Sequence, residues 1–93
     1  MLRISEMSRT GGETVLRIEG DLIGLLVDEM RKACAPFLRD GHRLTLDLAD
    51  VALTDHHAIA LLKELLDSHV ALINSSAFLS EQLREDRHQQ LSE

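Results

Sequence analysis

The spacing of apolar residues switches repeatedly between two periods along this chain, and this pattern limits the folds that it can adopt. Leu16 and Ile18 alternate with charged residues, and Leu44, Leu46 and Leu48 alternate with polar residues further on. Alternation of this kind is typical of a strand with one buried face. After each run, apolar residues recur at steps of three and four, which indicates amphipathic helices. The sequence therefore predicts strands that alternate with helices.

The first helical pattern contains a proline. Asp21 or Gly24 is a candidate cap for its start. Pro36 lacks an N–H group and its ring clashes with the preceding turn, so we expect a kink or an early end near Cys34. Gly41 is placed to close the segment. The apolar face of this helix is formed by Ile23, Leu26, Val27, Met30, Cys34 and Leu38.

The second helical pattern follows the second alternating run, and Asp55 or Thr54 is a candidate N-cap. Its broad apolar face is formed by Ala58, Leu61, Leu62, Leu65 and Leu66. A short buried strand is expected from Val70. Ser75 or Ser76 is then placed to cap a last helix. The apolar residues of that last helix are Phe78, Leu79 and Leu83.

These elements give the order β-β-α-β-α-β-α. We expect a single domain over residues 1–85 and a polar tail over residues 86–93 that frays. Gly11 and Gly12 suit a tight turn, which predicts that the first two strands form an antiparallel hairpin. The last three strands are joined through helices and should therefore be parallel to one another.

The strands keep polar residues on one face, formed by Arg17, Glu19, Thr45 and Asp47. A parallel sheet that is covered on both faces would have continuous apolar strands instead. We therefore expect an α/β fold with a mixed sheet of about four strands. Helices should lie mainly on one face, and the second face should be open to water or to a partner.

The composition argues against several classes of function. Phe37 and Phe78 are the only aromatic residues, so base stacking on aromatic side chains is not expected. The formal net charge of −6 disfavours contacts with nucleic acid and with anionic membranes. No apolar run approaches the roughly 20 residues that span a membrane, and no signal-peptide core is present. Cys34 is the only cysteine and cannot form an internal disulfide. We expect a cytoplasmic protein.

Two adjacent histidines, His56 and His57, stand where the second alternating run gives way to the second helix. Neighbouring side chains on a helix do not face each other, so the pair is poorly suited to share a metal ion. Asp55 and His57 could both approach an ion, but the other histidines lie in separate elements. We therefore predict neither a metal site nor a cofactor.

Catalysis is not predicted either. Cys34 lies on the apolar face of the first helix, where a buried structural thiol is expected rather than a nucleophile. Asp55 could orient an imidazole, but adjacent side chains seldom meet in this way, and no serine or cysteine is placed as a partner. The glycines at positions 11 and 12 open a strand rather than a helix, so they do not form a phosphate loop. We expect no enzyme activity and assign no catalytic residue.

Three segments resemble the STAS domain, the family of the bacterial anti-sigma-factor antagonists and of the cytoplasmic domains of sulfate transporters. The family has a strand that ends in Asp-Leu-Ser, a short apolar link, and Asp-Ser-Ser-Gly at the start of a helix. Here Asp47-Leu48-Ala49 and Asp55-His56-His57-Ala58 follow that outline. Residues 19–22 match the Gly-x-Leu before the first helix, and residues 71–83 resemble the later strand and helix. The resemblance covers residues 1–85.

The resemblance implies a protein-interaction module. In the antagonists, a partner kinase that is also the anti-sigma factor phosphorylates the serine after the helix-start aspartate. A phosphate there adds charge of about −1.5 to −2 within the contact surface and can switch the partner off. His56 replaces that serine in this chain, and Thr54 precedes the aspartate rather than following it. The implied partner-binding site, with a degenerate switch, consists of Thr54, Asp55, His56, His57 and Ala58.

The leading hypothesis is therefore a non-enzymatic regulatory module in bacterial signalling and transcription regulation. Its partner would be an anti-sigma-factor-like kinase or a larger signalling assembly, without control by serine phosphorylation. One alternative is a small-ligand or nucleotide-sensing domain, because a helix start offers free N–H groups. A second alternative is a homodimer that forms through the open polar face or through the edge strand near residues 2–7.

Overall fold

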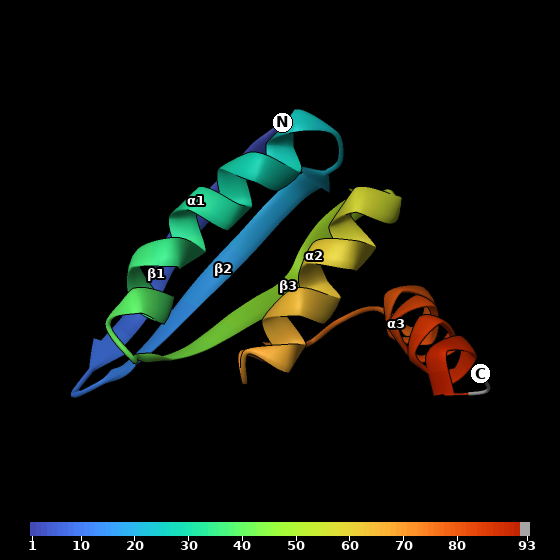
Figure 1. Ribbon diagram of the computed structural model, residues 1–93. Coiled ribbons are helices and arrows are strands. Elements are labelled where there is room, and N and C mark those ends of the chain that lie inside the picture. Colours follow the sequence, from blue (N-terminus) through green and yellow to red (C-terminus); the bar gives the residue numbers. More distant parts are fainter. Residues whose placement is uncertain (92–93) are drawn as a thin grey trace.

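The computed structural model describes the backbone of residues 1–91 and the side chains of residues 1–84 (Figure 1). The elements follow the predicted order β-β-α-β-α-β-α. Their bounds are β1 Leu2–Thr10, β2 Glu13–Leu22, α1 Leu25–Arg39, β3 Arg43–Thr54, α2 His56–Asp67, β4 Ala71–Ile73 and α3 Ala77–Leu91. Each change in apolar period along the sequence therefore corresponds to a junction between a strand and a helix.

The four strands form one mixed sheet in the order β1-β2-β3-β4. β1 pairs antiparallel with β2 across the turn at residues 11–12, which confirms the predicted hairpin. β2 pairs parallel with β3, and β3 pairs parallel with β4, as the helical connections require. Because β2 and β3 are adjacent and parallel, the helices that follow them begin beside each other, at the carboxyl ends of the two strands.

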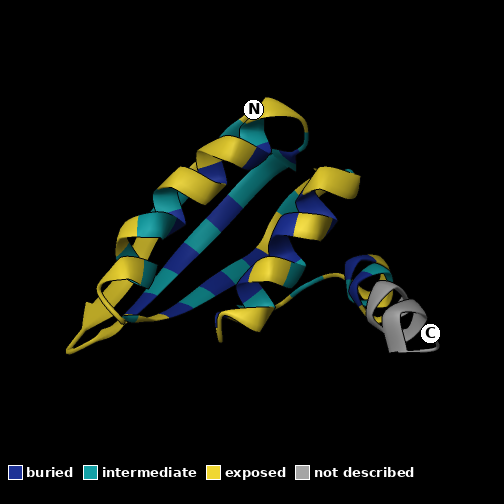
Figure 2. Ribbon diagram, in the orientation of Figure 1, coloured by how far each residue is buried: buried dark blue, intermediate teal, exposed yellow. Residues whose placement is uncertain are grey.

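The core lies between the sheet and the helices. Figure 1 shows α1 and α2 side by side over one face of the sheet, as predicted, with α3 beside α2. Buried and half-buried residues alternate along most of β2 and along the first half of β3 in Figure 2. The buried apolar residues are Leu16, Ile18, Leu22, Val27, Met30, Cys34, Leu44, Leu46, Leu48, Ala58, Ile59, Leu61, Leu62, Leu65, Val70, Leu79 and Leu83.

Glycines stand at both ends of α1. Gly24 is the N-cap residue, with φ 54°. Gly41 follows the C-cap residue Asp40 with φ 71°, and its N–H donates a hydrogen bond to the Leu38 carbonyl oxygen at 3.3 Å. Both values of φ are left-handed, where residues with a Cβ are strained. Both glycines therefore take the terminal positions that the sequence suggested.

Pro36 lies inside α1 and does not end it. We expected a kink or an early end near Cys34, and the early end is wrong, because α1 continues to Arg39. Pro36 is exposed, so the carbonyl group that loses its helical donor can accept a hydrogen bond from water. Phe37 and Leu38 pack against the core on the other side. Their burial holds the last turn in place despite the missing hydrogen bond.

The last helix, α3, buries only some of its apolar side chains. Phe78 is 69% exposed, while Leu79 and Leu83 are buried. Leu79 and Leu83 are four residues apart and share one face of α3, whereas Phe78 points away from that face. α3 continues to Leu91, and the fraying of the polar tail over residues 86–93 stays a prediction. The side chains after residue 84 and residues 92–93 lie outside the described part of the chain.

No helix within residues 1–91 combines the length and the apolar character needed to cross a bilayer.

The burial pattern makes a direct prediction about stability. Leu46 is fully buried at the centre of the sheet, whereas Leu25 is 83% exposed. Replacing Leu46 by alanine removes buried methyl groups and leaves a cavity, so Leu46→Ala should lower the free energy of unfolding by about 2–5 kcal/mol. The matched variant Leu25→Ala should change it by less than about 0.5 kcal/mol. Urea unfolding measures both, and equal effects would contradict the proposed core.

Candidate functional site at the start of helix α2

The junction between β3 and α2 is built around Asp55. Thr54 ends β3 and pairs with Leu22 of β2. Asp55 is the N-cap residue of α2, and its Oδ1 atom accepts a hydrogen bond from the Ala58 N–H at 3.0 Å. This bond satisfies one of the N–H groups that the first turn of a helix leaves without a partner. The predicted cap is confirmed.

The second oxygen of Asp55 reaches the other helix. Asp55 Oδ2 accepts a hydrogen bond from the Gly24 N–H at 2.8 Å, and Gly24 is the N-cap residue of α1. One carboxylate therefore connects the starts of α1 and α2. The hydrogen bonds from Gly24 and Ala58 hold the pKa of the Asp55 carboxyl below its ordinary value, because they favour the charged form.

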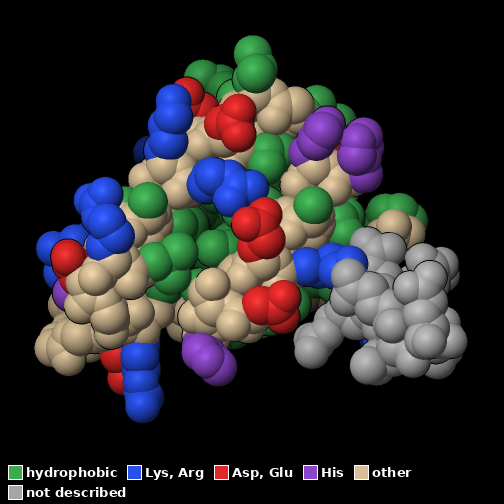
Figure 3. Space-filling model, in the orientation of Figure 1, with side chains coloured by type: hydrophobic (Ala, Val, Ile, Leu, Met, Phe, Trp, Pro, Cys, Tyr) green, Lys and Arg blue, Asp and Glu red, His purple; other side chains and the backbone are tan. Residues whose placement is uncertain are grey.

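His56 and His57 are the first two residues of α2, and both are exposed. Their ring centroids lie 4.1 Å apart at an interplanar angle of 37°. The space-filling view shows histidine side chains gathered at one end of the molecule, over the start of α2 (Figure 3). The two imidazole rings are therefore available to a partner.

Ala58 has a different role from the other predicted site residues. Its side chain is fully buried, and its N–H is bound to Asp55. The small side chain lets the first turn of α2 pack closely against the core. Of the five predicted residues, Thr54 and Asp55 are half-buried, Ala58 is buried and the two histidines are exposed.

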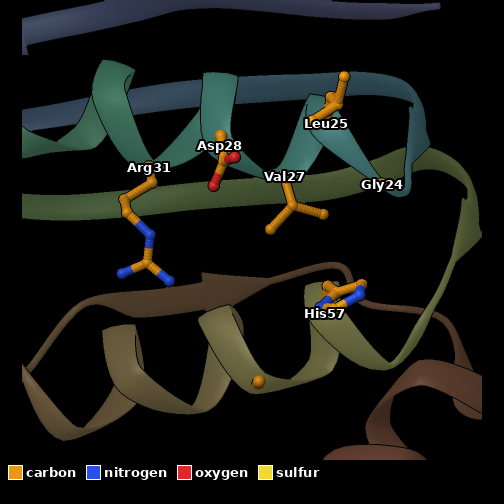
Figure 4. Close-up of a pocket in the computed structure, with 7 residues that line it drawn as sticks. Gly24, Leu25, Val27, Asp28, Arg31 and His57 are labelled. Atoms are coloured by element: carbon orange, nitrogen blue, oxygen red, sulfur yellow. The ribbon is translucent and has the colours of Figure 1, made fainter.

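A groove of about 390 Å³ runs between α1 and α2, next to the histidines. It is lined by Gly24, Leu25, Val27, Asp28, Arg31, His57 and Ala60. Figure 4 shows Arg31 extending from α1 toward α2. Arg31 makes two hydrogen bonds to Glu64 of α2, at 3.2 and 3.0 Å. This bidentate ion pair fixes the far end of the groove, and Asp55 fixes the near end.

Exposed apolar side chains surround the start of α2, which the sequence analysis did not foresee. Leu25, 83% exposed, lines the groove together with His57. Leu53 and Phe78, 57% and 69% exposed, line a smaller hollow of about 130 Å³ together with Thr54. Leu53 sits just before the cap, so its place was visible in the sequence. The contribution of Phe78 depends on how α3 packs.

The described side chains offer little for metal or thiol chemistry. Within residues 1–84, no three His, Cys, Asp or Glu side chains are grouped so that they could hold a metal ion. His88, one of the five histidines, lies outside that range. Cys34 is fully buried, and burial raises the pKa of its thiol to about 11. The thiol therefore remains protonated and unreactive at neutral pH.

The architecture and this helix-start junction define a STAS-like fold, as predicted. Among solved structures, the chain is similar to the anti-sigma factor antagonist SpoIIAA in its unphosphorylated form. The TM-score is 0.73 at 14% sequence identity, over 88% of this chain and 82% of that chain. No protein-family model and no curated protein sequence matches the chain. At this identity, the likeness establishes the fold alone.

The double hydrogen bond of Asp55 predicts a pH-dependent contribution to stability. In Asp55→Asn, the amide can still accept one hydrogen bond, but its NH₂ group cannot accept the N–H of Gly24. The urea midpoint at pH 7 should therefore fall. The pKa of Asp55 is lowered in the folded state, so its stabilisation is present above about pH 3.9, the ordinary carboxyl pKa. It is lost as the pH falls through the lower folded value.

The difference in urea midpoint between the wild type and Asp55→Asn should consequently shrink on acidification. The matched control is Asp67→Asn, which neutralises an exposed carboxylate in the last turn of α2. A negative charge is unfavourable at a helix C-terminus, so this variant should not lower the midpoint. A constant difference at all pH values would contradict the role assigned to the Asp55 carboxylate.

Proposed function

We propose that this protein is a non-enzymatic regulatory module of STAS type that binds a protein partner through the start of α2. The surface consists of Thr54, Asp55, His56, His57 and the underlying Ala58. The observation that carries the proposal is the group of exposed apolar side chains around this helix start, formed by Leu25, Leu53 and Phe78. Leu25 lines the groove beside His57, and Leu53 and Phe78 line the hollow beside Thr54. Exposed apolar side chains around a hollow support a protein-binding surface.

The proposed partner is an anti-sigma-factor-like kinase or a signalling assembly in the bacterial cytoplasm. The likeness of the fold to SpoIIAA, an anti-sigma factor antagonist, supports this class of partner. Together, the two histidines and the apolar side chains supply an amphipathic contact surface. Its apolar centre would contribute most of the affinity, and its polar groups would contribute specificity.

Serine phosphorylation does not control this surface in the proposed function. His56 holds the position that matches the phospho-acceptor serine of the antagonists, and an imidazole ring has no hydroxyl group to accept the phosphate. Thr54 ends β3 and is only half-buried, but it precedes the cap instead of starting α2. We therefore expect the partner to bind regardless of the activity of a serine kinase.

Binding of an anionic ligand at this helix start is the less favoured alternative. A free helix N-terminus attracts anions through its N–H groups and its dipole. Here the Asp55 carboxylate already accepts hydrogen bonds from the Ala58 N–H and from the Gly24 N–H. A second negative charge would be repelled by it, so the local electrostatics favour a protein partner over a nucleotide phosphate.

Affinity capture from the native host, with mass spectrometry of the captured proteins, tests this proposal. The wild type should retain an anti-sigma-factor-like kinase or a signalling subunit. Leu53→Glu places a charge within the apolar surface and should weaken binding of that protein at least about tenfold. The variant carrying both His56→Glu and His57→Glu should also weaken it. Purified components and a direct titration give the affinities.

The matched control is Ile73→Glu, because Ile73 is 41% exposed on β4 and lies away from the start of α2. The Ile73→Glu variant should bind the captured partner with the same affinity as the wild type. If the α2 variants bind as tightly as the control does, the partner uses a different surface and the assignment of this site is wrong.

A further inference from the structure

A third hollow, larger than the two beside the start of α2, lies away from them, between β1 and α1. Its volume is about 630 Å³. It is lined by Leu2, Ile4, Leu26, Glu29, Lys32 and Ala33. Leu2 and Ile4 of β1 are only partly buried and pack against the core. The groove is therefore an incompletely covered extension of the core, with two charged residues along its α1 side.

β1 borders this groove and is an edge strand. It pairs with β2 on one side only, through residues 2–10. The backbone N–H and C=O groups on its other side have no partner strand in the described sheet. Ile4 pairs with Ile18, which places the Ile4 side chain on the same face as the helices. An added strand would therefore satisfy the open backbone groups and cover the groove together.

We propose that the occupant is β1 of a second copy of this chain, which pairs antiparallel about a two-fold axis at Ile4. A register centred on Arg3 would oppose two guanidinium groups, and one centred on Glu6 would oppose two carboxylates. A register centred on Ser5 would set Ile4 against Glu6. The register centred on Ile4 instead opposes Ile4 to its own copy at the axis and pairs Arg3 with Ser5, while Leu2 meets Glu6 only in the outer pairs, away from the axis.

The α1 side of the groove is self-complementary under the same axis. A two-fold axis reverses the direction of the second α1. With the axis between residues 30 and 31, Glu29 faces Lys32 of the second copy, and the symmetry makes two such ion pairs. Both charged residues are exposed. Among residues 1–84, neither takes part in an ion pair within its own chain.

This dimer leaves the start of α2 free on both copies. Leu25 and His57 line the groove on the other side of α1, and Leu53 at the end of β3 and Phe78 of α3 line a separate hollow. The inference is thus independent of the proposed function. A dimer of this kind has two copies of the partner-binding surface, and two linked surfaces bind a multivalent assembly more tightly than one.

A charge-swap series with light scattering and sedimentation over a range of concentrations tests the interface. The wild type should show a reversible monomer–dimer equilibrium. Glu29→Lys and Lys32→Glu each oppose like charges at two symmetric positions and should raise the dimer dissociation constant at least about tenfold. The double variant with both changes should restore it to within about threefold of the wild type. Far-ultraviolet circular dichroism confirms that each variant is folded.

The matched control is Asp28→Lys, which makes the same charge change at the neighbouring residue of α1, on the side facing α2. It should leave the dimer dissociation constant unchanged. Cross-linking gives a second readout, because Ile4→Cys places two thiols opposite each other within reach of a disulfide. The buried Cys34 does not compete. Ile4→Cys should form a covalent dimer under oxidation, and Ile73→Cys on β4 should not.

Three results would overturn this proposal. A protein that stays monomeric at the highest attainable concentration excludes the second copy as occupant. A dimer that is insensitive to the single charge reversals uses another face. A covalent dimer through position 73 but not through position 4 places the contact at the opposite edge of the sheet.

Discussion

One carboxylate joins the starts of the two helices α1 and α2 at the candidate surface. Asp55 lies between β3 and α2. It caps α2 by accepting a hydrogen bond from the Ala58 N–H, and it accepts another from the Gly24 N–H at the start of α1. β2 and β3 are adjacent and parallel, so the two helices that follow them start close together, where one side chain can contact both. The left-handed backbone at Gly24 allows its N–H to meet this carboxylate. Two helix starts are thus held together at the candidate surface.

This constraint has chemical consequences. The carboxylate accepts a hydrogen bond from an N–H group that could otherwise bind an anion. The imidazole rings of His56 and His57 remain exposed beside it. The groove beside them is held at its far end by the ion pair of Arg31 with Glu64. A rigid surface of this kind loses little conformational entropy when a protein binds. Its apolar contacts come from three different elements, the start of α1, the end of β3 and α3.

The two surfaces described for this chain lie on opposite sides of α1. One joins α1 to α2 and the other joins α1 to β1. Both surfaces lie beside α1, where side chains of the sheet and of the helices are not fully covered. A domain of this size buries a modest fraction of its surface, so such surfaces are costly unless another chain covers them. Binding of another chain would bury the apolar side chains that are exposed there.

Local chemistry was legible in the sequence. Alternation at Leu44, Leu46 and Leu48 determined a half-buried strand, and Asp55 determined the start of the helix after it, because periodicity and capping act within a few residues. Contacts between distant elements were decided only by the tertiary structure. The bond from Gly24 to Asp55 spans 31 positions, and the exposure of Phe78 depends on how α3 packs. Pro36 stays within α1 because the neighbouring side chains of Phe37 and Leu38 pack, partly buried, against the core. These three features depend on packing between residues that are distant in the sequence, which a short stretch of sequence does not determine.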